Sequence, residues 1–185
     1  MHHIILSQRI DTESTYTGDE LYYAYHFPAR YKNAIHKGDI FIYYQGNRLV
    51  KEQRYYFGTG KILGVEKIDE ENYVAKLSRC AEFINKVPIY LSDGSYYEQL
   101  GVTNGRLKPP WQSSIRAITE AAYNEILKAA DGLKPIQGRP IVEELKESLK
   151  SSVKRFYLND DVEAIVDVHQ ISEELIRVLC VKIDK

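Results

Sequence analysis

The chain has few of the features that would mark an exported or membrane-bound protein. It contains two cysteines, one tryptophan and one methionine in 185 residues. No apolar run approaches the roughly 20 residues that span a bilayer, and residues 1–7 lack the charged and apolar regions of a signal peptide. Cys80 and Cys180 have neither zinc-site nor disulfide spacing, so we expect two buried thiols. These absences predict a soluble, cytoplasmic protein without a membrane partner.

The chain also has no surplus of charge of one sign. Its 25 Lys+Arg stand against 26 Asp+Glu, which gives a formal net charge of −1. No overall field therefore draws the chain onto a polyanion, and a nucleic-acid site would have to be a local basic patch. The length of 185 residues fits one domain, or one domain with a small appendage.

Tyrosine is the residue that is over-represented, with 15 Tyr against 5 Phe and 1 Trp. Its ring offers a stacking face and its hydroxyl can donate or accept, which suits a half-wet binding surface better than a dry core. Aromatic rings, arginines and glycine turns concentrate within residues 25–65. Rings beside cations are typical of nucleic-acid recognition, although the same rings could be core.

The apolar pattern predicts a mostly antiparallel sheet or small barrel in the first 130 residues. We expect strands at 2–10, 40–44, 55–65, 73–77 and 87–91, a short helix at 29–35 and a long irregular loop at 92–112. Gly58, Gly60 and Gly64 interrupt the third of these strands and allow bulges. A helix that begins at Thr119 and stops at Gly132 should cover the sheet.

The C-terminal part is expected to be a separate piece. Two prolines and a glycine within residues 134–140 predict a linker. Ile141, Leu145 and Leu149 then recur at four-residue spacing, which predicts an amphipathic helix. Residues 159–185 mix helical and strand-like spacing and favour neither. We therefore divide the chain into a domain at 1–133 and a helical appendage or linker at 134–185.

Five motifs follow one another in an order that resembles a known family. They are Tyr-x-Phe-Pro-x-x-Tyr at 25–31, Gly-Asp-x-Phe-Ile-Tyr-Tyr at 38–44, Tyr-Phe-Gly-Thr-Gly-x-Ile at 56–62, Val-Pro-Ile at 87–89 and the helix entry at 114–127. Over residues 2–130 the chain resembles EVE-like domains of the PUA superfamily. Such domains are found fused to HNH nucleases and McrB-type motors in modification-dependent restriction systems, and their relatives YTH, ASCH and SRA bind N6-methyladenine or modified cytosine.

The resemblance implies an α+β fold, a small twisted β-barrel flanked by helices, with a pocket that captures a flipped, modified base. The regions that line this pocket in relatives, together with the long loop, supply these candidates: Ser7, Gln8, Tyr25, His26, Phe27, Tyr43, Tyr44, Gln45 and Trp111. Relatives usually have tryptophans in the pocket regions, whereas Trp111 lies in the loop beside two prolines, where it could instead anchor the loop. Since strand neighbours alternate faces, at most one of Tyr43 and Tyr44 can line a given pocket.

Basic residues cluster around the predicted first helix, the turn after Tyr44 and the long loop. Arginine holds phosphate with two parallel hydrogen bonds, so these side chains are candidate phosphate contacts, or else an ordinary solvated surface. The candidates are Arg30, Lys32, Arg48, Lys51, Arg54, Arg106 and Lys108.

The sequence carries no clear catalytic pattern. Gly58-Thr-Gly60 is not followed by the helix that a phosphate loop requires. The five histidines lack metal-ligand spacing. Asp131 with Glu144 and Lys146 imitates a nuclease motif but falls in a helical repeat. We expect a binding domain without enzymatic activity, metal or cofactor, which works with an effector nuclease or motor on another domain or subunit.

The sequence as a whole therefore predicts a DNA-binding specificity module of a defence system. It would recognise methylated adenine or modified cytosine by base flipping into an aromatic pocket. One alternative is a reader of RNA, modified or not, which a 2′-OH contact would distinguish from a DNA reader. Another alternative is a protein-interaction or nucleotide-sensing module, whose affinity would be indifferent to salt.

Overall fold

The computed structural model describes residues 2–10, 20–46, 50, 53–103, 109–136 and 149. All of these except Leu149 belong to one compact unit, residues 1–136, and the chain's other unit comprises residues 137–185. The predicted helix at 141–149, the pattern at 159–185 and Cys180 therefore lie outside the described residues, apart from Leu149 itself. No helix in the described part of the chain is long and apolar enough to cross a membrane.

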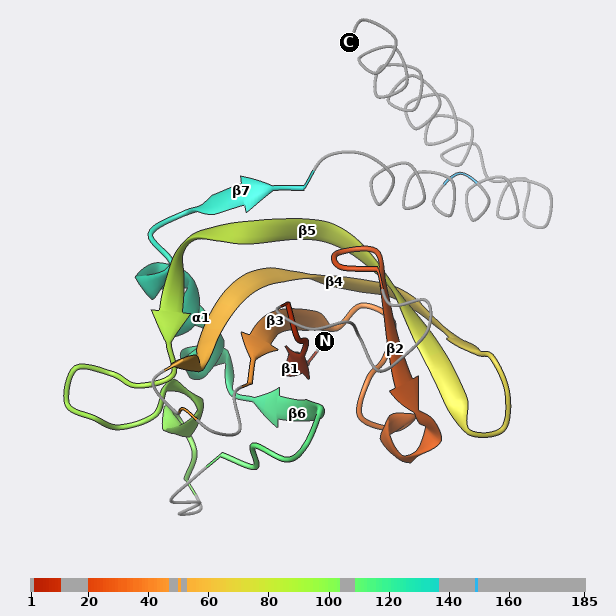
Figure 1. Cartoon of the computed structure of the whole chain (residues 1–185), viewed down its shortest axis with the longest axis horizontal. Coiled ribbons are helices and arrows are strands. Elements are labelled where there is room, and N and C mark those ends of the chain that lie inside the picture. Colours follow the sequence, from red (N-terminus) through yellow and green to blue (C-terminus); the bar gives the residue numbers. More distant parts are fainter. Residues whose placement is uncertain are drawn as a thin grey trace, which may run out of the picture. The chain divides into compact units, whose positions relative to one another are not determined.

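The described residues of the first unit are mostly strands, which form one sheet that curls into a half-barrel with a single helix (Figure 1). The strands are β1 His3–Ser7, β2 Ala24–Pro28, β3 Ile40–Gln45, β4 Tyr55–Lys67, β5 Asn72–Pro88, β6 Ile115–Ile118 and β7 Leu133–Pro135. The helix is α1 Glu120–Ala129, and the 3₁₀ turns are η1 Ala29–Tyr31 and η3 Tyr97–Gln99. The spatial order is β2-β5-β4-β3-β1-β6, with β7 paired to β5. A small, twisted, mostly β architecture is thus confirmed.

β1 and β3 form the parallel pair of this sheet, and the other pairings between described strands are antiparallel. Ser7 lies opposite Tyr44 in the β1–β3 register, and His3 lies opposite Ile40. Because the two strands run in the same direction, both end at one edge of the sheet and both begin at the other. Each edge therefore gathers side chains from two distant parts of the sequence.

The two faces of the sheet carry separate hydrophobic clusters, because side chains alternate along each strand. Phe41 and Tyr43 pack in the first cluster, whereas Ile42 and Tyr44 pack in the second. Burial of Cys80 in the first cluster confirms its prediction as a buried thiol. Helix α1 covers the second cluster through Ile126, which is fully buried.

The strand β4 confirms the role predicted for its glycines. Its pairing with β5 shifts register between Tyr56 and Gly58, between Thr59 and Lys61, and between Ile62 and Gly64. A Cβ atom on Gly60 would lie 2.7 Å from the Phe41 ring and 2.8 Å from the sulfur of Cys80. The glycines thus permit both the bulges and a close packing of the first cluster.

Helix α1 begins as the sequence predicts. The hydroxyl of Thr119 accepts a hydrogen bond from the backbone N–H of Ala122 at 3.0 Å, which caps the first turn. Beyond the last turn, Asp131 and Gly132 adopt positive φ angles of 55° and 123°. Gly132 therefore allows the chain to leave the helix in a left-handed conformation and enter β7.

The structure differs from the predicted secondary structure in four places. The expected helix at 29–35 is only the single turn η1, and the two strands expected at 73–77 and 87–91 are one continuous strand, β5. β2 and β6 occur where no strand was predicted. Residues 133–135 belong to β7, which pairs with β5, so the expected linker cannot begin at Lys134. Short strands of three to five residues give too few alternations for the pattern to reveal them.

Candidate nucleic-acid interface

The edge at which β1 and β3 end carries a group of aromatic and cationic side chains. Its members come from the end of β1, the end of β3, the residue before β4, the segment that leads into β6 and β6 itself. We call it the Trp111 cluster and define it by five residues: Ser7, Tyr44, Arg54, Trp111 and Arg116. The backbone joins two of these strand ends, since the N–H of Gln8 donates to the carbonyl of Tyr44 at 2.9 Å.

Trp111 is the half-buried centre of the Trp111 cluster. Its ring stacks on Tyr44 with a centroid distance of 5.5 Å and an interplanar angle of 26°, and Tyr96 meets it edge-on at 5.3 Å. The guanidinium carbons of Arg54 and Arg116 lie 5.7 and 5.4 Å from the Trp111 centroid. Such cation–π and stacking contacts hold the indole in one orientation.

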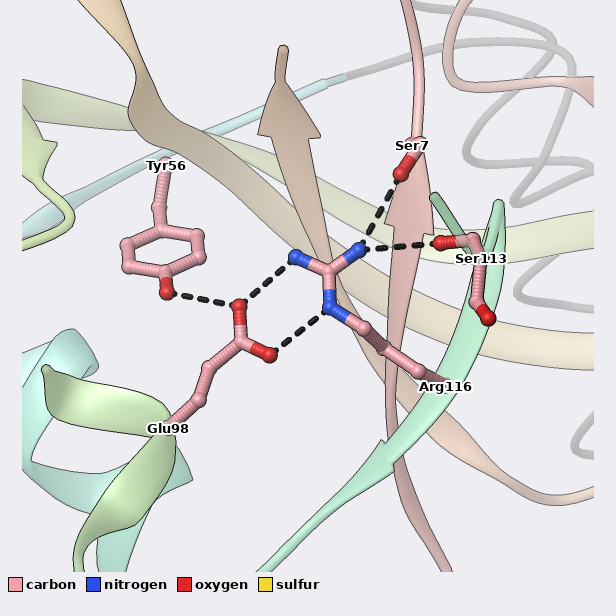
Figure 2. A network of polar contacts seen from close by, with 5 residues as sticks. All are labelled: Ser7, Tyr56, Glu98, Ser113 and Arg116. Carbon is pink, nitrogen blue, oxygen red and sulfur yellow. Dashed lines mark hydrogen bonds and ion pairs between the residues drawn. The ribbon is translucent and has the colours of Figure 1, made fainter. Parts of the chain in front are cut away.

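Arg116 anchors the Trp111 cluster from the interior through a polar network (Figure 2). Its Nε donates to Oε2 of Glu98 at 2.7 Å, and its Nη2 donates to Oε1 at 2.6 Å. Its Nη1 donates to the hydroxyl of Ser7 and to the carbonyl of Ser113, each at 3.2 Å. The Tyr56 hydroxyl adds a third hydrogen bond to Glu98, at 2.8 Å. The network fixes Arg116 beneath the Tyr44 ring, with 4.5 Å between guanidinium carbon and ring centroid.

The positive charge of Arg116 is balanced inside the protein by the negative charge of Glu98. Burial alone would lower the pKa of Arg116, but the hydrogen bonds and negative charge of Glu98 outweigh it, so the pKa of Arg116 is raised. Burial raises the pKa of Tyr44, against the opposing effect of the Arg116 and Arg54 charges. Arg116 is consequently a paired cation, and the half-buried Arg54 is the cation of the Trp111 cluster that is placed closer to solvent.

The structure does not bring the predicted pocket rings together as one set. Tyr25, Phe27 and Tyr43 pack in the first hydrophobic cluster, and each is at most 3% exposed. Tyr44 and Trp111 pack in the second cluster, on the other face of the sheet. The expected separation of Tyr43 from Tyr44 is confirmed. Strand alternation divides the five candidate rings between the two faces of the sheet, so Tyr44 and Trp111 lie apart from the other three.

Tyr25 has a contact that also bears on the Trp111 cluster. Its hydroxyl donates to the carbonyl of Ser7 at 3.2 Å and to that of Ser114 at 3.3 Å. This phenol thereby ties β2 to the end of β1 and to the segment before β6. Tyr25 therefore has a structural role, because its hydroxyl holds the end of β1 next to the segment before β6.

The polar pocket candidates are divided in the same way. Ser7 accepts the hydrogen bond from Arg116, and Gln8 is half-buried beside it. Gln45 is buried, and its Oε1 accepts from the backbone N–H of Ile10 at 2.8 Å. His26 lies between Tyr25 and Phe27 on β2, so alternation places its ring on the face opposite to theirs.

Three of the predicted phosphate contacts are described by the structure. Arg54 stacks on Trp111, and Arg30 is exposed with its guanidinium carbon 4.9 Å from the centroid of the Tyr31 ring. The Tyr31 hydroxyl accepts from the backbone N–H of Ser114 at 3.0 Å, which brings η1 to the segment before β6. Lys32 is exposed. The remaining candidates lie outside the described residues: Arg48, Lys51, Arg106 and Lys108.

Sequence reasoning missed Arg116, which contacts Trp111, and the network behind it, in which Glu98 binds both Arg116 and Tyr56. Glu98 lies in the stretch that was expected to be irregular loop, and Arg116 lies in the helix-entry motif. An arginine between Ile115 and Ala117 in an otherwise apolar run is the one signal of burial that the sequence offered. No signal in the sequence connected Arg116 to Glu98.

Comparison with known proteins adds no evidence about function, so any functional assignment depends on the residues of the Trp111 cluster. No protein-family model matches the sequence, and a search of curated proteins finds no match. The chemistry that the Trp111 cluster offers is an oriented indole face or edge, an adjacent guanidinium and polar groups at two strand ends. This combination can stack a planar group and hold an anion beside it.

Proposed function

We propose that the chain is a nucleic-acid reader that recognises a modified base, most favourably in DNA, at the Trp111 cluster. The observation that carries the proposal is the stack of Trp111 on Tyr44 with the Arg54 guanidinium within 6 Å of the indole centroid. An indole held in one orientation beside a cation is a suitable partner for a flipped base and its adjoining phosphate.

The proposal assigns distinct roles within the Trp111 cluster. Tyr44 is only 3% exposed, so it supports the indole and does not itself contact the base. Trp111 stacks on the base, which is worth about 1–3 kcal/mol and offsets the few kcal/mol of flipping. Arg54 holds the neighbouring phosphate. Gln8, half-buried at the end of β1, offers a hydrogen bond to the edge of the base.

The same proposal extends to the family and the biological context. The curled half-barrel with one helix is compatible with the EVE-like fold of the PUA superfamily that the five sequence motifs resemble. An EVE-like chain of this kind would act as the specificity module of a modification-dependent restriction system. Its effector nuclease or motor would then be a separate domain or subunit, and this chain would only bind.

A binding screen tests the proposal. Duplexes with unmodified bases, 5-methylcytosine, 5-hydroxymethylcytosine or N6-methyladenine at one position are titrated against the full chain. We expect one modified duplex to bind at least about tenfold more tightly than the unmodified one, which corresponds to 1.4 kcal/mol. Equal weak binding of all four duplexes would refute modified-base recognition.

A matched pair of variants locates the site. Trp111→Ala should remove the discrimination between modified and unmodified duplex. Tyr73→Ala provides the control, because Tyr73 is also half-buried and also stacks on a buried ring, Phe27, at 5.8 Å. Loss of discrimination in both variants would indicate a general effect on the fold. Full retention in Trp111→Ala would exclude the Trp111 cluster as the base site.

RNA is the competing ligand, and it is tested in the same assay. Matched single strands of DNA and RNA distinguish the two, since a contact to the 2′-OH has no counterpart in DNA. If the chain prefers RNA, the ligand of the Trp111 cluster is RNA and not DNA, and the proposed position of the site is unchanged. Affinity that does not fall as salt rises would instead favour a protein or nucleotide partner, because phosphate contacts weaken with salt.

A further inference from the structure

The edge at which β1 and β3 begin carries a group of side chains that can act as metal ligands. His2 immediately precedes β1, and Asp39 immediately precedes β3. The parallel pairing brings them together, since the N–H of Ile40 donates to the carbonyl of His2 at 3.0 Å. His36 joins them from the turn before β3. His2 lies 34 and 37 positions before His36 and Asp39, so the sequence spacing of the three residues does not indicate a metal site.

Asp39 is the fixed member of this group. It is 2% exposed, and its two carboxylate oxygens accept backbone hydrogen bonds, Oδ1 from His2 at 2.9 Å and Oδ2 from His36 at 2.8 Å. Each carboxylate oxygen retains a second lone pair. Hydrogen bonds of this kind orient a carboxylate ligand and hold it ready for a metal ion.

The imidazole rings of His2 and His36 are the members of this group that can reorient. Nδ1 of His2 lies 3.3 Å from Oδ1 of Asp39, and Nδ1 of His36 lies 3.5 Å from Oδ2. One donor atom from each of the three residues lies within 4.8 Å of the other two. Both histidine side chains are more than half exposed, at 70% and 55%, so their rings can rotate to close the remaining distance.

These separations suit a tetrahedral ion. Two ligands bound at about 2.0–2.1 Å are about 3.3–3.4 Å apart around a tetrahedral centre, but only about 2.9 Å apart around an octahedral one. The 3.3 Å between Nδ1 of His2 and Oδ1 of Asp39 matches the tetrahedral value. The 3.5 Å contact of His36 is to the other oxygen, Oδ2, so the His36 ring would turn toward the same ion. Two imidazoles with one carboxylate are also a donor set that zinc accepts, with a fourth position left for water or another ligand.

The fourth position would face a hollow of about 330 Å³ beside the two histidines. Its lining includes His2, Asn33, His36 and Ile118. A three-ligand site that opens into such a space can admit a small exogenous ligand, whereas a purely structural zinc site is closed by four protein ligands. Asp39 does not line the hollow itself, so an ion held by all three residues would lie between the buried carboxylate and this space.

We propose that His2, His36 and Asp39 form a binding site for a zinc-type divalent ion with one open coordination position. The site lies at the opposite ends of β1 and β3 from the Trp111 cluster and is independent of nucleic-acid binding. The ion would bridge the starts of two strands that are distant in sequence, and it would stabilise the native state by an amount that rises with the logarithm of its free concentration above the dissociation constant.

The test uses the full chain after removal of metals with a chelator. It is titrated with ZnCl2 by calorimetry and with CoCl2 by visible absorption, whose intensity distinguishes tetrahedral from octahedral cobalt. We expect one equivalent to bind, tetrahedral cobalt spectra and a higher midpoint of thermal unfolding with zinc. His2→Gln and His36→Gln each remove a direct ligand, so each should weaken zinc binding by at least the roughly 10–100-fold that loss of an outer-shell partner costs.

Two histidine variants serve as controls. His26→Gln changes a half-buried imidazole on β2, and His3→Gln changes the neighbour of His2. The His3 side chain also lines the hollow, but its ring packs on the Tyr123 ring, with 4.8 Å between the centroids. Both should bind zinc as tightly as the unmodified chain. The proposal is overturned if the chain binds no zinc, if binding survives the double variant His2→Gln, His36→Gln, or if His3→Gln weakens it equally.

Discussion

Arg116 and Glu98 form a two-point ion pair in which both side chains are 3% exposed, with contacts of 2.6 and 2.7 Å. The pair joins β6 to η3 across 18 residues of sequence. Arg116 also holds the end of β1 through Ser7 and lies under the ring that supports Trp111. The candidate interface is therefore built on a charge pair inside the protein.

Removal of one member of this pair should destabilise the protein strongly. Glu98→Gln leaves the Arg116 charge buried without its counter-ion, so we expect the free energy of unfolding to fall by about 3–5 kcal/mol in urea denaturation. The double variant Glu98→Leu, Arg116→Met removes both charges and should lie closer to the original stability. Lys128→Gln, which breaks the exposed pair with Glu125, should change stability by less than about 1 kcal/mol. A loss for Glu98→Gln as small as that for Lys128→Gln would contradict the argument.

The glycines of β4 provide a second stability test. An alanine Cβ at Gly60 would lie 2.7 Å from the Phe41 ring, whereas an alanine Cβ at Gly64 would have no atom within 4 Å. Gly60→Ala should therefore cost about 1–3 kcal/mol through overpacking. Gly64→Ala should be neutral or stabilise by up to about 1 kcal/mol, because alanine restricts the unfolded chain. Equal midpoints of chemical denaturation for the two variants would rule out close packing at Gly60 as the cause.

Much of the sheet could be predicted from local pattern, because β1, β3 and β4 carry long apolar runs and α1 carries the Thr119 cap. The alternation rule also separated Tyr43 from Tyr44 correctly. The pattern predicts two strands at 73–77 and 87–91, whereas the structure has one strand, β5, which ends at Pro88. Within β5, Arg79 has a φ of 48°, a conformation that nothing in the sequence indicates.

The candidate site could be predicted only in part. The side-chain chemistry of Trp111 and Arg54 makes both candidates, but their contact depends on the start of β4 lying beside the segment before β6. The pairing of Arg116 with Glu98 is a tertiary contact between residues in two different elements. The convergence of His2 and Asp39 follows from the parallel register of β1 and β3, which the sequence pattern left unspecified. Local periodicity contains no information of this kind.

Buried tyrosines should make the fold sensitive to alkaline pH. Burial, followed by the negative charge of Glu98, raises the pKa of Tyr56 well above its usual value, and burial does the same for Tyr43. In the unfolded chain both would ionise near pH 10. The native state thus retains these protons more tightly, so stability is complete below about pH 10 and is lost as pH rises toward the native pKa values.

Tyrosinate absorbance combined with urea denaturation measures this effect. The exposed tyrosines should titrate first, and the buried ones only in a step that coincides with unfolding. Each buried tyrosine contributes a slope of up to about 1.4 kcal/mol per pH unit in that range. Tyr56→Phe lowers stability at neutral pH, since the hydrogen bond to Glu98 is lost, but should flatten the alkaline slope. An unchanged slope in Tyr56→Phe would show that this tyrosine is not kept neutral by the fold.

Salt dependence isolates the contribution of Arg54 to nucleic-acid binding. If its guanidinium contacts a phosphate, Arg54→Gln should reduce the slope of log affinity against log salt by about one unit. Arg54→Lys keeps the charge but loses the planar group that stacks on Trp111, so it should keep the slope and bind more weakly at every salt concentration.

Lys67→Gln is the matched control for this measurement. Lys67 is an exposed cation at the other end of β4 from Arg54, where it pairs with Glu70. Its replacement should leave the salt slope unchanged if the phosphate contact is local to the Trp111 cluster. A slope that falls equally in Arg54→Gln and Lys67→Gln would point to a diffuse effect of net charge. Since the chain's formal charge is only −1, such a diffuse effect should be small, and a local contact should dominate the difference.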